Sequence, residues 1–387
     1  MHIITLPPYA LTASYLADIL KRLYNVAMNS KYSPYLLRCE EEIHKALPQN
    51  PSKDWLEQSF GKLDSAVQVE HVQPLIEPTL SLVNLGGKRW RPLLLVLTAQ
   101  AYLTKTGKFS QESMEDIYAL VPLVEFIHTA SLIHDDIEDR SDSRRGKPCA
   151  YITYGTDTAI NAATWLYFEA ASCIQRSHLD EETKMALYAC YSQEVRRLHL
   201  GQAMDIAWHN SNEAEPSPQE YLAMVQNKTG TLASLAVRTG LLATHGEPKA
   251  IEKLTNSAKQ IGAGFQVIDD VLNLTSGNAG KNRGDDIVEG KKSLPVMLFI
   301  TSCRKENQDE KISELKNCFT QAKAEGIKSP AVERAIELLS KNGAIEKARQ
   351  QGISFIENAC STFENYFGKD NEASCLITAL FREMANG

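Results

Sequence analysis

Carboxylates at the ends of two apolar stretches are the residues in this sequence whose types and spacing could do chemistry. The first group lies in LIHDDIEDR, where Asp135 and Asp139 stand one helical turn apart, with Asp136 and Glu138 beside them. Like charges at this spacing on a helix cost roughly 0.2–0.5 kcal/mol per pair. A divalent cation would reverse that cost, because Mg²⁺ is typically held by one or two carboxylates together with phosphate oxygens. The spacing therefore indicates a Mg²⁺ site at the mouth of a buried region.

A second acidic group strengthens this interpretation. The segment FQVIDDVLNL ends another apolar helix with Asp269 and Asp270, and Asn273 follows one turn later. One acidic group alone is more typical of a solvated helix end, with Asp136 and Arg140 as a surface ion pair. Two apolar helices that both end in paired acids can instead face each other across a cavity and hold several metal ions.

Basic side chains that could bind phosphate are interleaved with these acids. Arginine binds phosphate through two parallel hydrogen bonds, and glycines such as Gly86 and Gly87 let the backbone approach a phosphate closely. Each basic group alone is weak evidence, since most lysines and arginines are solvated, but their interleaving with the acids favours a metal-diphosphate site. The candidates are Lys88, Arg89 and Arg91 in NLGGKRWRP, Arg144, Arg145 and Lys147 in SDSRRGKP, then Lys228, Lys281, Lys291 and Lys292, with the acids Asp285, Asp286 and Glu289 among them.

The elements that must position these residues are helices. Apolar residues three and four apart recur from Ser59 to Ala385, and no convincing run alternates as a strand would. We therefore expect an all-α fold, a single-domain bundle of long helices around a central cavity. The helices expected nearest the site cover 92–103, 117–136, 160–174 and 182–207.

A break near residue 50 divides the chain into a short extension and one large domain. The segment LPQNPS interrupts the helical pattern, and Ser52 can cap a helix that begins near Lys53. We expect residues 1–50 to form an N-terminal helical extension of unknown purpose and residues 51–387 to form the functional domain.

Composition narrows the class of protein. The 387 residues include 41 basic and 48 acidic side chains, a net charge of −7, which is a poor match for nucleic-acid binding. We expect no membrane span, because no stretch approaches roughly 18 apolar residues. The N-terminus does not read as a secretory signal, and eight cysteines without a CxxC pair are typical of reduced thiols. The expected location is the cytoplasm.

The motifs, taken in order, resemble those of the trans-type isoprenyl diphosphate synthases, the all-helical polyprenyl synthetase family. The resemblance runs from about Gly86 to Pro295, the central half of the chain. It rests on GGKRWRP, IHTASLIHDDIEDRSDSRRGKP, GQAMD, KTG, FQVIDD and GKNRGDDIVEGKKSLP. It implies that residues 51–387 form a synthase domain that condenses isopentenyl diphosphate with an allylic diphosphate, most similar to geranylgeranyl diphosphate synthases. Members are commonly homodimers.

The resemblance also implies roles for individual residues. Three Mg²⁺ ions would be held by Asp135, Asp139 and Asp269, with support from Asp136 and Asp270. The allylic diphosphate would be bound by Arg144, Lys228 and Lys281, with Thr229 and Gln266 nearby. Isopentenyl diphosphate would be bound by Lys88, Arg91, His128 and Arg145, and Phe265 would pack beside the reacting carbons. The second motif ends in Asn273 where many members carry Asp, which predicts an active enzyme with altered metal affinity.

Small residues below the first acidic group predict the product length. Ala130 and Ser131 lie about one turn before Asp135, and Ile127 lies about a turn further down. In the family that this chain resembles, aromatic residues here stop the product at fifteen carbons. Small ones therefore imply at least twenty, with the floor of the pocket formed by Phe126 and by Trp165, Tyr167 or Phe168, although each is equally well an ordinary core residue.

Four other functions compete with this interpretation. A longer-chain polyprenyl synthase would share every motif. A class I terpene cyclase also uses paired acids and Mg²⁺, but it needs no second diphosphate site, so GGKRWRP and the Arg144-Arg145 pair count against it. A non-catalytic subunit of a heteromeric synthase usually loses aspartates, and only Asn273 fits that pattern. A purely structural helical protein would not need the interleaved charges.

Overall fold

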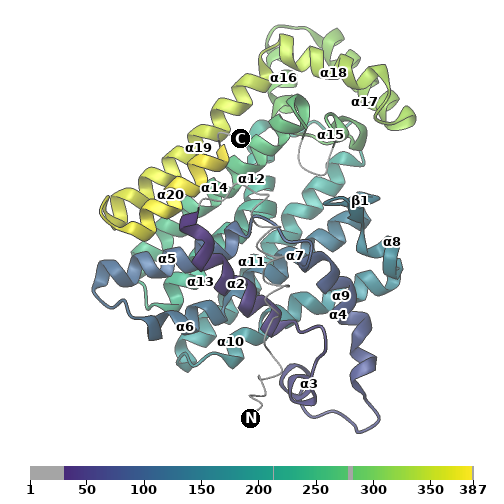
Figure 1. Ribbon diagram of the computed structural model, residues 1–387. Helices are drawn as coiled ribbons and strands as arrows, with labels where there is room; N and C mark the ends of the chain where they lie inside the picture. The colour runs from purple at the N-terminus through teal and green to yellow at the C-terminus, as the bar shows by residue number, and fades with distance from the viewer. Residues whose placement is uncertain (1–29, 212, 278–281, 386–387) are drawn as a thin grey trace, which may run out of the picture.

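Helices form almost all of the regular structure in the computed structural model (Figure 1). The structure describes residues 30–211, 213–277 and 282–385. Within these ranges the strands are β1 (Ser143–Arg144) and β2 (Lys147–Pro148), a two-residue antiparallel pair. The expected all-α class is confirmed.

The helices follow one another along the chain with short connections. From the N-terminus these are η1 (Ser30–Tyr32), α2 (Ser33–Ala46), α3 (Lys53–Phe60), η2 (Val69–Val72), α4 (Gln73–Val83), α5 (Trp90–Thr106), α6 (Gln111–Ala119), α7 (Val121–Glu138), α8 (Ala150–Tyr154), α9 (Thr156–Ala170), α10 (Ser172–Arg176) and α11 (Glu181–His209). They continue with α12 (Pro218–Val225), the π-turn η3 (Gln226–Gly230), α13 (Thr231–Ala243), α14 (Pro248–Thr275), α15 (Asp285–Glu289), α16 (Leu294–Lys305), α17 (Asp309–Glu325), α18 (Pro330–Lys341), α19 (Ala344–Phe367) and α20 (Glu372–Ala385).

Local sequence explains where several of these helices begin and end. The Ser52 side chain accepts a hydrogen bond from the Trp55 backbone N–H and caps α3, as expected. In α5, Pro92 lies in the first turn, and the helix ends at Gly107, whose φ of 70° lies in the left-handed region that glycine tolerates. The expected helix over 92–103 is therefore present, and nearly every one of its residues is buried.

The prediction of a single helix over 117–136 is wrong, because the structure has two helices there, α6 and α7. The break falls at Leu120, and Pro122 opens α7. Proline has no backbone N–H to donate and clashes with the preceding turn, so it favours a new helix start. The expected helix over 160–174 is likewise interrupted, at Ala171.

The apolar segment that contains these two helices bears on the expectation of no membrane span. By length and composition alone, Gln111–Glu138 is long and apolar enough to cross a membrane. Its most apolar window is 72% buried inside the protein, which is what a core helix gives.

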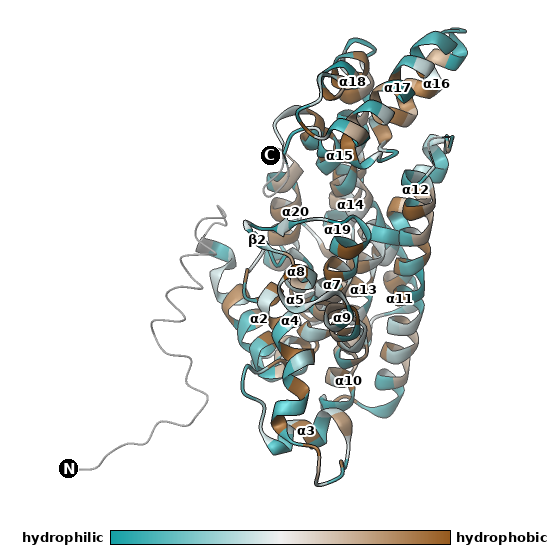
Figure 2. Ribbon diagram, turned by 90° about the vertical axis from the view of Figure 1, so that its right-hand side faces the viewer, coloured by the Kyte–Doolittle hydropathy of each residue, from teal (hydrophilic) through white to brown (hydrophobic). Residues whose placement is uncertain are grey.

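The long helices pack side by side around α13 and α14. Helix α13 contacts α5, α11 and α14, while α14 lies along α19 and α7 lies along α9. A second hydrophobic cluster joins the end of α14 to α12, α16, α17 and α18, and these last three helices form a separate group at the top of Figure 2. The site described below lies where these two parts of the core meet.

The described part of the expected N-terminal extension is continuous with the main core. Helix α2 packs against α5 and α7, and Leu36, Cys39 and Ile43 belong to the same buried cluster as those helices. Residues 1–29 lie outside the described part of the chain.

Candidate active site

The first acidic group lies at the C-terminal end of α7 and is directed toward basic side chains. Asp135 accepts hydrogen bonds from the Lys228 ammonium at 3.2 Å and from the Gln202 amide at 3.0 Å. Asp139 follows the last residue of α7, and its backbone N–H donates to the Asp135 carbonyl at 2.8 Å. Burial alone would raise the pKa of Asp135, but the charge of Lys228 above all holds that pKa well below its usual range.

Asp136 faces the other way, into the β1–β2 hairpin. It is buried and accepts hydrogen bonds from Arg144 Nε at 2.7 Å and Nη2 at 2.6 Å. The alternative of a surface pair between Asp136 and Arg140 is therefore wrong. Arg144 Nη2 also lies 3.9 Å from Asp135, so one guanidinium holds the first two acids of the motif together.

The second acidic group lies at the C-terminal end of α14, with one acid exposed and one buried. Asp270 is the buried one, and it accepts hydrogen bonds from the Tyr221 hydroxyl at 2.5 Å and the Gln266 amide at 3.1 Å. Burial and the nearby charge of Asp286 raise the pKa of Asp270 to about 7. Asp269 is the exposed carboxylate, so a ligand can reach it from solvent.

Asn273 holds the loop that precedes the acids Asp285, Asp286 and Glu289. Its side-chain carbonyl accepts from the Asp286 backbone N–H at 3.2 Å, and its amide donates to the Asn282 carbonyl at 3.4 Å. Asn273 is fully buried. An aspartate at this position could accept the first hydrogen bond but could not donate the second one. The departure from the family's Asp thus has a local explanation in the loop.

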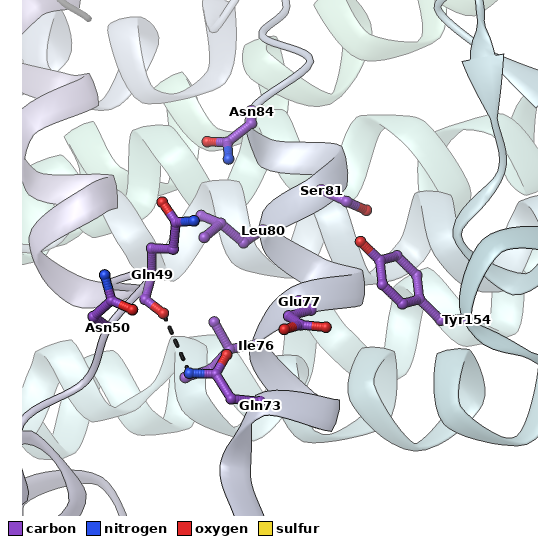
Figure 3. Close-up of a pocket in the computed structure, with 9 residues that line it drawn as sticks. All are labelled: Gln49, Asn50, Gln73, Ile76, Glu77, Leu80, Ser81, Asn84 and Tyr154. Atoms are coloured by element: carbon purple, nitrogen blue, oxygen red, sulfur yellow. Dashed lines mark hydrogen bonds between the residues drawn. The ribbon is translucent and has the colours of Figure 1, made fainter. Parts of the chain in front are cut away.

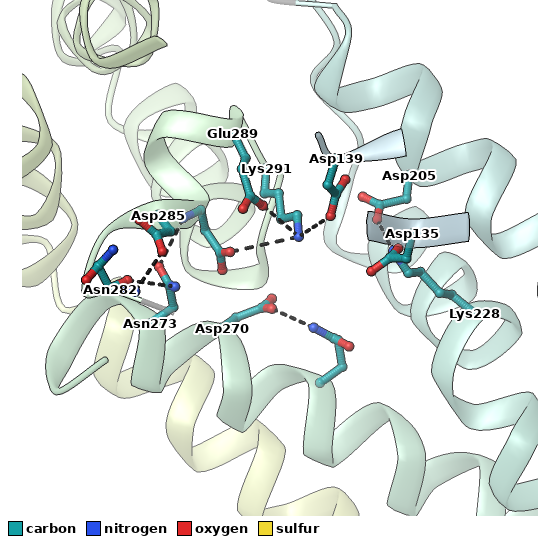
Figure 4. Close-up of polar contacts among 12 residues, drawn as sticks. Asp135, Asp139, Asp205, Lys228, Asp270, Asn273, Asn282, Asp285, Glu289 and Lys291 are labelled. Atoms are coloured by element: carbon teal, nitrogen blue, oxygen red, sulfur yellow. Dashed lines mark hydrogen bonds and ion pairs between the residues drawn. The ribbon is translucent and has the colours of Figure 1, made fainter. Parts of the chain in front are cut away.

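Lys291 connects the end of α7 to the acids of the segment around α15 (Figure 4). Lys291, between α15 and α16, lies 2.8 Å from Glu289, 3.4 Å from Asp139 and 4.0 Å from Asp286. Burial alone would lower the pKa of Lys291, but these carboxylates, Asp139 first, raise it well above its usual value. The neighbouring Lys292 points elsewhere, with its ammonium over the Phe319 ring.

Three residues that the sequence analysis did not assign to the site belong to it. Asp205 pairs with Lys228 at 2.6 Å, Gln202 donates to both Asp135 and Glu138, and Tyr221 supports Asp270. Gln202 and Asp205 both lie in GQAMD, a motif recognised without a role. Tyr221 lies in none of the recognised motifs, and only the packing of α12 beside α14 brings it to Asp270.

A second group of cations lies beside the acids. Arg91 lies 3.2 Å from the His128 ring, and its Nε is buried without a hydrogen-bond partner among the described residues. Burial lowers the pKa of Arg91 to about 10. Burial, then the charges of Arg91 and Arg145, also lower the pKa of His128 well below its usual value, so its ring is neutral at physiological pH. Arg91, beside a neutral His128, is suited to binding an anion.

Close approach of the backbone completes this second group. The Arg145 guanidinium lies against Gly87, where a Cβ atom would come within 2.9 Å of it. Lys88 is exposed beside them. Lys88, Arg91, His128 and Arg145, predicted from widely separated segments, thus lie near one another.

The remaining predicted residues take the following places. Thr229 donates a hydrogen bond to Gln266 at 3.0 Å, and Phe265 packs on Trp90 and Phe381 with ring centres 5.3 Å and 5.6 Å away. Lys281 lies outside the described residues.

The residues predicted to set product length line α7 below the first acidic group. Ile127 and Ala130 are fully buried, while the partly buried Ser131 donates its hydroxyl to the His128 carbonyl. Tyr167 stacks on His134, which directly precedes Asp135, with ring centres 5.7 Å apart, so Tyr167 lies level with the acids and not at a floor below Ile127. Phe168 is 70% exposed in the single chain, which argues against a floor formed by Phe168 within one chain.

A separate polar pocket lies away from the acidic groups (Figure 3). It is bordered by Gln49 and Asn50, by α4 and by Tyr154 of α8, and none of the predicted site residues lines it.

The donor set fits Mg²⁺ that is shared with a phosphate. Among the described residues, no three His, Cys, Asp or Glu side chains form a group that could hold a metal ion alone. The carboxylates of Asp135 and Asp139 pair with Lys228 and Lys291, across from Asp270 of α14 (Figure 4). This fits Mg²⁺, which takes one or two carboxylates and completes its shell with phosphate oxygens and water.

Comparison with known proteins places this site in a family. Residues 72–335 match the family model described as Polyprenyl synthetase. A "Short chain isoprenyl diphosphate synthase" from Methanocaldococcus jannaschii is 33% identical over 72% of this chain and 80% of that protein. A "Geranylgeranyl diphosphate synthase" from Methanosarcina mazei is 30% identical over 76% of this chain and 85% of that protein.

Solved structures agree with these relatives. Geranylgeranyl pyrophosphate synthetase from Pyrococcus horikoshii superposes with a TM-score of 0.74 and 26% identity, over 96% of this chain and 99% of that one. The Corynebacterium glutamicum geranylgeranyl pyrophosphate synthase, complexed with isoprenyl diphosphate and magnesium, has the same fold, with a TM-score of 0.74 and 23% identity over 92% of this chain and 99% of that one. The chain therefore belongs to the polyprenyl synthetase family.

Proposed function

We propose that this chain is a geranylgeranyl diphosphate synthase. It condenses isopentenyl diphosphate with an allylic diphosphate and releases diphosphate and a trans-prenyl diphosphate of about twenty carbons. The observation that carries the proposal is the presence of two adjacent sites, the acids at the end of α7 paired with Lys228 and Lys291 and the cations around Arg91. Relatives named as geranylgeranyl diphosphate synthases support the product class.

The acidic groups form the allylic diphosphate site. Asp135, Asp139 and Asp269 would hold Mg²⁺, about three ions, with Asp136 and Asp270 as supports. When bound, the metal neutralises the charge that develops on the leaving diphosphate. Lys228 and Arg144, which now contact the acids, bind the same diphosphate, and Lys281 joins them.

The Arg91 group forms the isopentenyl diphosphate site. Lys88, Arg91 and Arg145 supply the positive charge, and the neutral His128 is placed to accept a hydrogen bond from Arg91. Phe265, Trp90 and Phe381 form an aromatic wall that excludes water from the allylic cation.

A product assay tests this function. Purified protein with Mg²⁺ and labelled isopentenyl diphosphate is given dimethylallyl, geranyl or farnesyl diphosphate in turn, and the products are sized by chromatography. A twenty-carbon product is expected. Longer products would assign the chain to the longer-chain synthases, cyclised hydrocarbons would indicate a terpene cyclase, and no product from any starter would favour a non-catalytic subunit.

We further propose that the enzyme is a cytoplasmic homodimer. Ile160 and Phe168 are exposed, and their eight-residue spacing puts them on one face of α9. Large apolar side chains exposed on one helix face favour a partner surface, and a second copy is the partner proposed here.

A further inference from the structure

Arg89 lies within the GGKRWRP motif but faces away from the phosphate site. Its side chain is 2% exposed. Its Nε donates to Glu40 at 2.7 Å, its Nη1 donates to Glu125 at 2.5 Å, and its Nη2 donates to the Val83 carbonyl at 2.7 Å. Nη2 also reaches the second oxygen of Glu40 at 3.4 Å, so Glu40 binds this guanidinium through both of its oxygens.

These contacts converge from three helices on one backbone turn. Glu40 lies on α2, Glu125 on α7 and Val83 at the end of α4. Arg89 itself precedes α5 with φ 45° and ψ 26°, a left-handed conformation that disfavours any side chain. A residue persists in such a conformation only where its surroundings hold it.

The turn at Arg89 separates two residues of the isopentenyl diphosphate site. Lys88 before it is exposed, and Arg91 after it lies beside His128. The charges of this buried group also extend to that site, since Glu125 acts on the pKa of Arg91 and of Arg145. Any shift of the Arg89 backbone therefore moves the cations on either side of it.

We propose that Glu40 is a positioning residue for the isopentenyl diphosphate site: by holding Arg89, it fixes the turn that directs Lys88 and Arg91. Helix α2, which precedes the matched family region at residue 72, is then a working part of the enzyme rather than an appendage. The inference rests on the proposed function and adds a residue to it.

Steady-state kinetics of the full chain with Mg²⁺ test this role. Glu40→Ala is expected to raise the KM for isopentenyl diphosphate by about tenfold or more, because displacing a substrate-binding group by about 1 Å is enough for such a loss. The KM for the allylic diphosphate changes less than about twofold, because Arg89 does not contact that site. Glu40→Gln keeps one acceptor oxygen for Arg89 and recovers most of the loss. Glu41→Ala, on the exposed side of α2, is the matched control and stays at wild-type values.

Glu40→Asp covers the case in which the alanine variant does not fold. Its carboxylate keeps the charge but ends one methylene short of Arg89, so the same selective rise in KM is expected. Equal rises in both KM values, or a lower melting temperature with unchanged kinetics, would overturn the positioning role. Inactive wild-type protein would overturn the proposed function itself, which is a separate outcome.

Discussion

At the scale of single residues, Ala130 is the side chain whose size bears most directly on the product. It is fully buried on α7, about one turn below Asp135. Ala130→Phe is expected to shorten the product toward fifteen carbons, because the ring fills the space that the growing chain would enter. Overpacking costs roughly 1–3 kcal/mol of stability. The product assay is therefore run well below the melting temperature of the variant.

Leu132→Phe is the matched control for this change. Leu132 lies two residues along α7 but packs in a different hydrophobic cluster, beside Ile133 and Ala163. The control should give the wild-type product. An unchanged product length in Ala130→Phe would exclude the proposed path of the chain along α7.

His128 makes a prediction about pH at the same scale. Burial, Arg91 and Arg145 depress its pKa in the folded protein, so the unfolded chain binds more protons below its ordinary pKa of about 6.5. The free energy of unfolding should therefore fall as the pH is lowered from about 7 to about 5, by up to ~1.4 kcal/mol per pH unit from this residue.

His128→Gln should make that fall shallower. Denaturant unfolding of wild type and variant at a series of pH values measures the difference. His178→Gln replaces an exposed histidine and serves as the control. Parallel stability curves for wild type and His128→Gln would show that His128 protonates freely in the folded state.

At the scale of elements, Lys291 joins the end of α7 to the segment between α15 and α16. Its ammonium is shared by Asp139, Glu289 and Asp286. Lys291→Met should lower the melting temperature in EDTA by roughly 5 °C or more, because breaking a buried ion pair leaves carboxylates without their cation. Added Mg²⁺ should then raise the melting temperature by more than it does in wild type.

Lys292→Met provides the comparison for this experiment. Lys292 is adjacent in sequence, but its ammonium lies over Phe319 rather than among these carboxylates. Its response to Mg²⁺ should match that of wild type. If Mg²⁺ stabilises Lys291→Met and wild type equally, Lys291 and the metal do not share the same carboxylates.

At the scale of the whole molecule, the exposed face of α9 predicts association. Phe168 is 70% exposed and Ile160 is 44% exposed. Phe168→Glu should convert a dimer to a monomer in sedimentation velocity, because burying a carboxylate in an apolar contact is costly. Phe109→Glu, in the connection between α5 and α6, should leave the mass unchanged. A wild-type monomer at micromolar concentration would contradict the homodimer.

The sequence by itself determined the helical class, the order of the motifs and most of the candidate site residues. Helical periodicity, caps such as Ser52 and the four-residue spacing of Asp135 and Asp139 are local properties, so they can be recognised without any tertiary contact. The break at Leu120 is also encoded locally, by Pro122, although the apolar pattern continues across it.

Only the tertiary structure decided how the charges pair. Lys291 meets Asp139 across 152 residues of sequence and Lys228 meets Asp135 across 93, distances over which no local pattern specifies a partner. Within GGKRWRP, adjacent basic residues look alike in sequence, yet Lys88 faces solvent while Arg89 is buried between Glu40 and Glu125. The physical reason is that burying a charge requires partners of opposite charge, and these partners come from helices that only the fold brings together.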